Sequence, residues 1–270
     1  MKEILSRMVQ GSPAPAAALN RVREYLQARI LSAVGRAGGM IALGFCGGTA
    51  LRFLYDLPRY SEDLDFTLHR KNKGFELRKA VLAVRGELEA ENYEVGLKIS
   101  TARAVQAALI KLPGLMYELG LSGHRRQALS VRVEVDTAPP AGVRCETSLV
   151  RRHLTLRLQH HDRASLLAGK LHAVLMRPYV KGRDLHDLLW YLADPGWPPP
   201  NLELLNNALE QTGWQGARLE PANWAAAVSE RLAGIDFKHA VEDVRPFLEP
   251  GTDAGLIPRD NLEQLLKKRR

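Results

Sequence analysis

GGTALRFLYDLPRYSEDLD, residues 47–65, places a pair of glycines ahead of a helical segment and a pair of aspartates on the extended segment that follows. The apolar residues just before it, in MIALGFC (40–46), predict a short buried strand that runs into the glycine turn. TALRFLYDL (49–57) is typical of a helix that ends before Pro58. In SEDLDFTLH (61–69), Leu64 and Phe66 alternate with Asp63 and Asp65, which predicts a second strand with one acidic face.

The glycine turn and the acidic strand together indicate phosphate chemistry. Gly47 and Gly48 permit a tight turn with outward N–H groups, Thr49 adds a hydroxyl, and the helix that follows offers its positive end to an anion such as a triphosphate. Asp63 and Asp65 direct two carboxylates to one face, where a hard cation such as Mg²⁺ relieves their repulsion. Each feature alone is common, the first as a turn and the second as the wet face of a sheet. In this order they predict a site for in-line phosphoryl or nucleotidyl transfer.

Outward from this stretch, the patterns predict a small mixed sheet with flanking helices. Apolar spacings of three and four predict a helix over residues 16–37, and residues 75–91 are also helical in character. Strands are expected at 93–100 and at 129–139, where valines alternate with charged residues. Glu134 lies on the polar face of the second strand and could join the metal site or position an attacking hydroxyl. Asp136 shares that face, and a solvated edge strand is the alternative for both.

Beyond Pro139 the sequence is mostly helical. Asp162 is a suitable N-cap for RASLLAGKLHAVLM (163–176), and RDLHDLLWYLA (183–193) predicts the next helix. DPGWPPP (194–200) has the composition of a linker or boundary. The expected fold class is therefore α/β (α+β), with a mixed-sheet core and its N-terminal helix in residues 1–150 and a mainly helical part in residues 151–270.

Several charged residues lie in contexts that suit either a functional or a structural role. Lys170 stands among leucines, so it either extends to water or has an anionic partner. Asp184 and Asp187 share one helical face, where N-terminal capping is the structural alternative. Arg59, just ahead of the acidic strand, could neutralise phosphate charge. Arg52 could do the same, although surface pairing suits it better.

The composition limits the class of protein. The 270 residues carry a formal charge of +8 and a pI of about 9.6, which suits RNA or nucleotide but equally a solvated basic surface. Two cysteines, Cys46 and Cys145, are expected to be free thiols in a cytoplasmic protein. No stretch reaches the roughly 18 apolar residues of a membrane span, and no signal peptide is expected. The histidines suggest no zinc site, and the tryptophans are expected in the core or at an interface.

Four segments resemble the AbiEii/AbiGii-type nucleotidyltransferases, the toxin components of type IV toxin–antitoxin and abortive-infection systems. The segments are NRVREYLQARIL, GFCGGTALRFLYDLPRYSEDLDF, VRVEVDT and KLHAVLMRPYVKGRDLHDLLW, in the order of that family, and the resemblance extends from about Leu19 to Leu192. It implies a polymerase β-like nucleotidyltransferase core. Residues 201–270 carry no resemblance of their own.

The resemblance also implies roles for individual residues. It makes Gly48 and Thr49 the phosphate-binding turn, and we expect Gly47 and Arg59 beside the nucleotide from the residue pattern described above. Asp63 and Asp65 become metal ligands, and Glu134 becomes the third acidic position, since many relatives have Asn where this chain has Asp136. Lys170 resembles the lysine that contacts nucleotide phosphates. Asp184 resembles the carboxylate of a KGRD-type motif, with Asp187 one turn further on, and Lys170 and Asp184 are expected to contribute to the active-site cleft.

The function implied by the resemblance is Mg²⁺- or Mn²⁺-dependent transfer of NMP from an NTP to an RNA acceptor such as the tRNA 3′ end, by a toxin with a cognate antitoxin. Two alternatives stay open at the level of sequence. One is a toxin that nucleotidylates a protein, and the other is a non-catalytic nucleotide- or RNA-binding module.

Overall fold

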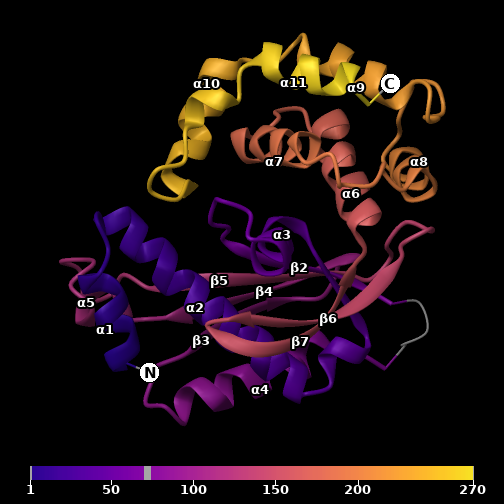
Figure 1. Ribbon diagram of the computed structural model, residues 1–270. Helices are drawn as coiled ribbons and strands as arrows, with labels where there is room; N and C mark the ends of the chain where they lie inside the picture. The colour runs from indigo at the N-terminus through magenta and orange to yellow at the C-terminus, as the bar shows by residue number, and fades with distance from the viewer. Residues whose placement is uncertain (1, 70–73, 270) are drawn as a thin grey trace. The chain divides into compact units, whose positions relative to one another are not determined.

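The computed structural model describes residues 2–69 and 74–269, and it divides the chain into two compact units (Figure 1). The first unit comprises Met1–Ala138 and Glu146–His160, and the second comprises Pro139–Cys145 and His161–Arg270. The first contains the sheet and the second is helical, so the expected α/β class with a helical C-terminal part is confirmed.

Within the described residues, seven strands form one mixed sheet in the order β3-β4-β5-β2-β1-β7-β6. The middle strand β2 and its neighbour β1 are antiparallel to each other, whereas β2 runs parallel to β5 and β1 runs parallel to β7. Their central position explains why the segment after β1 and the polar face of β2 occupy the middle of this unit. The strands are β1 (Leu43–Cys46), β2 (Asp63–Leu68), β3 (Gly96–Ser100), β4 (Val105–Leu112), β5 (Leu129–Asp136), β6 (Cys145–Arg152) and β7 (Leu154–His161).

The helices of the first unit pack their apolar stripes on this sheet. The long helix α2 packs against α4, and the two contact the sheet through β5 and β4 (Figure 1). Valines at alternate positions of β5 are fully buried, as their spacing predicted. The elements are α1 (Lys2–Gln10), α2 (Pro15–Arg36), η1 (Gly39–Ile41), α3 (Gly47–Tyr55), α4 (Leu77–Glu89) and α5 (Leu115–Glu118).

The second unit is a cluster of helices in which α7 contacts α6, α10 and α11. Asp162 caps α6 as predicted, since its carboxylate accepts a hydrogen bond of 2.7 Å from the Ser165 N–H. Leu185, Leu188 and Tyr191 form the buried side of α7. The elements are α6 (Arg163–Met176), α7 (Gly182–Ala193), α8 (Leu202–Gln211), α9 (Trp224–Leu232), α10 (Phe237–Val244), η2 (Arg245–Phe247), η3 (Ala254–Leu256) and α11 (Arg259–Lys267).

Three strands were not predicted from the sequence. β4 (Val105–Leu112) pairs with β5, and β6 and β7 extend the sheet beyond β1. Residues 151–152 and 154–161 therefore lie in the strands of the sheet, and the first helix after them begins at Arg163. Cys46 and Cys145 are thiols that are not joined in a disulfide. No helix in the described part of the chain combines the length and apolar character required to cross a bilayer.

Candidate active site

The glycine turn joins β1 directly to α3. β1 ends at Cys46, and Gly47, with φ of 76°, begins the helix. A Cβ at Gly47 would collide with Oδ2 of Asp65, which reaches across from β2. Two separate features therefore require glycine at this position: the left-handed backbone and the close approach of the Asp65 carboxylate.

Gly48 has a different neighbour. A Cβ there would lie 2.6 Å from Nη2 of Arg59 and 3.1 Å from Oγ of Ser61, so the arginine packs against the bare glycine backbone. Arg59 is buried, and its Nη1 donates a 2.9 Å hydrogen bond to the carbonyl of Tyr60. The predicted nucleotide-binding arginine thus lies beside the first turn of α3.

The N-terminus of α3 receives no side-chain cap from Cys46. Thr49 is completely buried, and its hydroxyl donates to the carbonyl oxygen of Asp63. This hydrogen bond joins the first turn of α3 to the beginning of β2. The helix end keeps the positive character of its N–H groups, which makes it suited to an anion.

The acidic face of β2 is confirmed as a structural feature. Leu64 and Phe66 are buried, whereas Asp63 and Asp65 are half-buried on the opposite face. β5 lies alongside in parallel register, with Asp65 opposite Glu134. Residues in register on neighbouring strands point to the same face, so the three carboxylates share it.

The carboxylates on this face offer the oxygen ligands that hard cations prefer, and Arg132 of β5 lies on the same face, opposite Asp63. Glu134 forms an ion pair of 3.2 Å with Arg132, two residues away, and the side chains are 33% and 51% exposed. Among the described residues, no three histidine, cysteine or acidic side chains are close enough to bind one metal ion. The metal-ligand roles of Asp63, Asp65 and Glu134 therefore stay predictions.

The second unit brings its three predicted residues into one buried ion cluster. Nζ of Lys170 lies 2.7 Å from Oδ1 of Asp184 and 2.8 Å from Oδ2 of Asp187. Arg177 pairs with the other oxygen of Asp184. Burial opposes ionisation of Asp184, but the charges of Lys170 and Arg177 outweigh it and lower the pKa of that carboxyl. Of the two possibilities for Lys170, extension to water or an anionic partner, the structure therefore shows the second.

A buried ionic network behind the glycine turn was missed by sequence reasoning. Glu24 of α2 and Arg52 of α3 are only 4% and 3% exposed, and their side chains approach to 2.5 Å. Arg152 of β6 and His153 also contact Glu24, at 3.2 and 2.7 Å. The sequence predicted an ion pair at the surface for Arg52. The ion pair exists, but it is buried. The signal available in the sequence was only the apolar surroundings of Arg52 on its helix.

This network holds Glu24 in its charged form. Burial opposes ionisation, but a hydrogen bond from His153 and the charges of Arg52 and Arg152 lower the pKa of Glu24 to about 2. Arg52 also donates to the carbonyl of Leu57 at 2.8 Å. α3 is thereby tied to α2 and to the β6–β7 hairpin.

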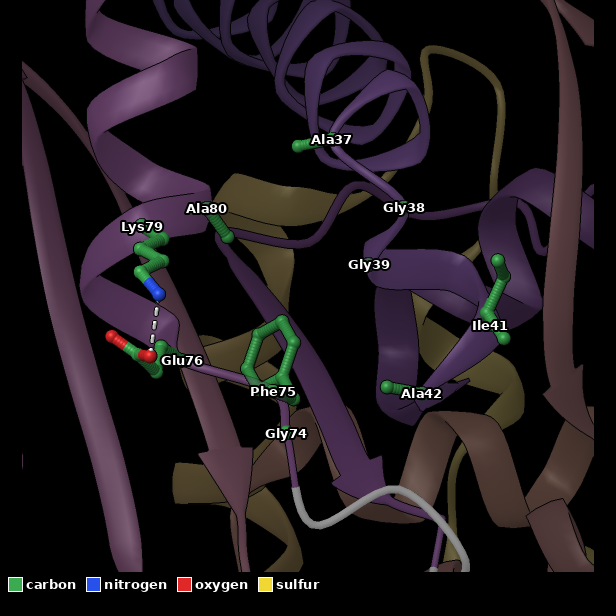
Figure 2. A pocket seen from close by; sticks show the side chains of 10 residues that line it. All are labelled: Ala37, Gly38, Gly39, Ile41, Ala42, Gly74, Phe75, Glu76, Lys79 and Ala80. Carbon is green, nitrogen blue, oxygen red and sulfur yellow. Dashed lines mark hydrogen bonds and ion pairs between the residues drawn. The ribbon is translucent and has the colours of Figure 1, made fainter.

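A separate hollow of about 310 Å³ lies between the end of α2, η1 and the start of α4 (Figure 2). Phe75 stands between Ile41 and an ion pair of Lys79 with Glu76. The other lining residues are glycines and alanines. None of the predicted site residues lines it.

Known proteins resemble this chain over most of its length. Residues 29–268 match the family described as nucleotidyl transferase AbiEii toxin, type IV TA system. Among solved structures, JHP933 from Helicobacter pylori is similar over 93% of this chain and 91% of its own, with a TM-score of 0.54 and 17% identity. A second H. pylori protein, described as a "putative nucleotidyltransferase", is similar over 92% of each chain, with a TM-score of 0.54 and 18% identity. At this identity the structural likeness concerns the fold alone. Among curated proteins, none matches the sequence significantly.

Proposed function

The chain belongs to the AbiEii family of nucleotidyltransferase toxins of type IV toxin–antitoxin systems, and from this premise we propose that it transfers NMP from an NTP to an RNA acceptor. The observation that carries the proposal is the contact between the two parts of the motif. The carboxylate of Asp65 packs against Gly47 at the N-terminus of α3, which supports a proposed anion site beside a proposed cation site. This is the juxtaposition that a metal–triphosphate substrate requires.

The glycine turn would bind the phosphates. Backbone N–H groups at Gly48 and Thr49 would donate to phosphate oxygens, while the Thr49 hydroxyl keeps the turn in place through Asp63. Arg59 would add positive charge from beside Gly48. These contacts would orient the triphosphate with its α-phosphate toward the acidic face.

Asp63 and Asp65 would hold Mg²⁺ or Mn²⁺. The bound metal would neutralise phosphate charge and favour departure of pyrophosphate. Glu134 would either complete the ligand set or accept the proton of the attacking hydroxyl. Its ion pair with Arg132 is partly exposed and therefore weak enough to exchange.

The reaction would be a substitution at the α-phosphate. The oxygen of the acceptor hydroxyl forms a bond to the α-phosphorus, and the bond from that phosphorus to the bridging oxygen of the β-phosphate breaks. Pyrophosphate leaves, and the hydroxyl proton passes to a carboxylate or to water. Lys170 would contact the phosphates, with Asp184 and Asp187 holding its ammonium group in place.

RNA is the acceptor that we propose, specifically a tRNA 3′ end, with the reaction in the cytoplasm. The support is the family resemblance together with the formal charge of +8. Membership of a type IV toxin–antitoxin family also implies a cognate antitoxin.

The acceptor is tested by incubating the purified protein with Mg²⁺, each α-labelled NTP in turn, total RNA and a protein extract. We expect label on RNA, and on a single size class if tRNA is the acceptor. Label confined to protein would replace RNA by a protein acceptor. Growth arrest that persists in an Asp65→Ala variant would instead indicate a non-catalytic binding module.

A further inference from the structure

The loop between α6 and α7 presents an exposed tyrosine. Tyr179 is 89% exposed, the highest value among the large apolar and aromatic side chains that the structure describes. Its neighbours Arg177, Pro178 and Lys181 are also exposed. Single exposed rings are common on protein surfaces, so the residues around Tyr179 decide whether it marks a binding site.

This loop is braced on both sides. Arg231 of α9 donates to the carbonyls of Arg177 at 2.8 Å, Val174 at 3.3 Å and Pro178 at 3.4 Å. On the other side, the Gly182 N–H donates to Asp243 Oδ2 at 2.8 Å, and a Cβ at Gly182 would collide with the Ala240 carbonyl oxygen. The backbone that carries Tyr179 is therefore anchored to α9 and α10, and the ring is presented at little entropic cost.

The residues of the loop itself are positively charged, while Asp243 of α10 reaches the backbone at Gly182. Residues 177–183, RPYVKGR, contain three cations and no acid. The nearest carboxylate along the chain, Asp184, is buried and already paired with Lys170 and Arg177. The guanidinium of Arg183 lies 4.3 Å from the centroid of the Phe247 ring, which fixes that cation beside the loop. An exposed ring with cations close by in the chain combines a stacking surface with phosphate contacts.

We propose that Tyr179, with Lys181 and Arg183, binds a single-stranded segment of the RNA acceptor by stacking on one of its bases. The proposal rests on the proposed function for the identity of the acceptor and adds the surface that binds it. Stacking requires an unpaired base, because a base inside a duplex offers no free face. The loop is therefore expected to distinguish single strands from duplexes and to be tolerant of base identity.

The composition favours RNA over a protein partner at this loop. Centres of protein–protein interfaces are apolar and depleted of lysine. Here the ring is flanked by exposed Arg177 and Lys181, and its apolar neighbours along the chain are exposed Pro178 and half-buried Val180. Such a setting provides stacking and phosphate neutralisation but little apolar area to bury.

The test is the affinity of the full chain for fluorescein-labelled single-stranded RNA of mixed sequence and for its duplex, measured without NTP. Tyr179→Ala should weaken single-strand binding about tenfold, and Tyr179→Phe, which keeps the ring, should stay within about twofold of the parent. Lys181→Ala should reduce the steepness of log affinity against log salt concentration by about one, the change expected when one phosphate contact is lost. Tyr117→Ala is the matched control, because Tyr117 is a 41% exposed tyrosine beside Arg125.

Equal single-strand affinity in Tyr179→Ala and the parent would overturn the proposal and leave the loop as a contact for protein. A loss of the same size for Tyr117→Ala would also overturn it, since any exposed ring would then suffice. The transfer reaction separates this inference from the proposed function. If the parent transfers nucleotide but Tyr179→Ala changes neither RNA affinity nor acceptor KM, only the loop assignment fails; if the parent labels no RNA, the proposed function fails whatever the loop binds.

Discussion

At the scale of single residues, Gly47 allows the carboxylate of Asp65 to lie against the backbone where α3 begins. Two independent constraints meet there, a φ of 76° and a side chain that leaves no room for a Cβ. The sequence showed the glycine pair and the aspartates, and it predicted correctly that they lie on a turn and on the face of a strand. It could not show that Asp65 touches Gly47, because their contact depends on the pairing of β1 with β2.

Alanine substitutions at Gly47 and Gly38 separate these two constraints, because Gly38 shares the left-handed backbone but not the close neighbour. Gly38 has φ of 78° but nothing within 4 Å of the place that an alanine methyl group would take, so Gly38→Ala should cost about 1–2 kcal/mol of unfolding free energy and keep transfer activity. Gly47→Ala should cost about 1–3 kcal/mol more and reduce transfer, because the methyl group displaces Asp65. Chemical unfolding and initial rates check both. Equal effects of the two substitutions on stability and rate would contradict the account.

At the scale of elements, the Glu24 network fastens α3 to α2 and to the β6–β7 hairpin. Arg152 and His153 come from the hairpin, and Arg52 comes from α3. A charge buried with its partners contributes little net stability, yet it becomes costly when one partner is removed. The network therefore acts mainly by fixing which helix faces meet.

This network predicts a specific loss of stability in acid. Because the pKa of Glu24 is lowered from 4.5 to about 2, its contribution is complete above pH 4.5 and disappears as the pH falls toward 2. The shift corresponds to a change in the free energy of unfolding with pH on the order of 3 kcal/mol, which is distinct from the small net stability of the network. This contribution of Glu24 is measured by thermal unfolding of the parent and of Glu24→Gln between pH 7 and pH 3. The stability difference should narrow as the pH falls below 4.5, and a constant difference would show that Glu24 is not held ionised by its partners.

The second unit allows the structural and nucleotide roles of Lys170 to be separated. Lys170→Met leaves the buried carboxylates of Asp184 and Asp187 with less compensation and should destabilise this unit by on the order of 3–5 kcal/mol. Adding Asp187→Asn removes one of these charges, so most of the stability should return. NTP affinity should stay low in both variants, because the phosphate contact is absent. Recovery of NTP affinity together with stability would show that Lys170 acts only inside the ion cluster.

The same scale shows where sequence patterns fail. Helices with regular apolar spacing, such as α2 and α6, were predicted to within a residue or two. The β6–β7 hairpin was missed because its turn carries no glycine, proline or asparagine. His153 alone joins the two strands, with φ of 57°, a conformation that histidine adopts more readily than most residues. β4 was missed because its apolar residues do not alternate clearly with polar ones.

At the scale of the whole molecule, each unit carries a distinct part of the predicted residue set. The first unit contains the glycine turn, Arg59 and the acidic face, and the second contains the cluster around Lys170. The family match spans both units, from residue 29 to residue 268, although residues 201–270 showed no resemblance by inspection. Family membership extends further along the chain than its recognisable motifs because helices such as α8 to α11 are specified by apolar spacing, which many sequences satisfy.

The central claim is that Asp63 and Asp65 support metal-dependent nucleotidyl transfer, and one comparison tests it most directly. Transfer from α-labelled NTP to RNA is measured for the parent, for Asp65→Asn and for Glu62→Gln, which removes the same charge three residues away and outside the acidic face. The account predicts Mg²⁺-dependent transfer by the parent and by Glu62→Gln, and a loss of at least about a hundredfold in folded Asp65→Asn. Equal transfer by Asp65→Asn and the parent, or no transfer by the folded parent with any NTP, would contradict it.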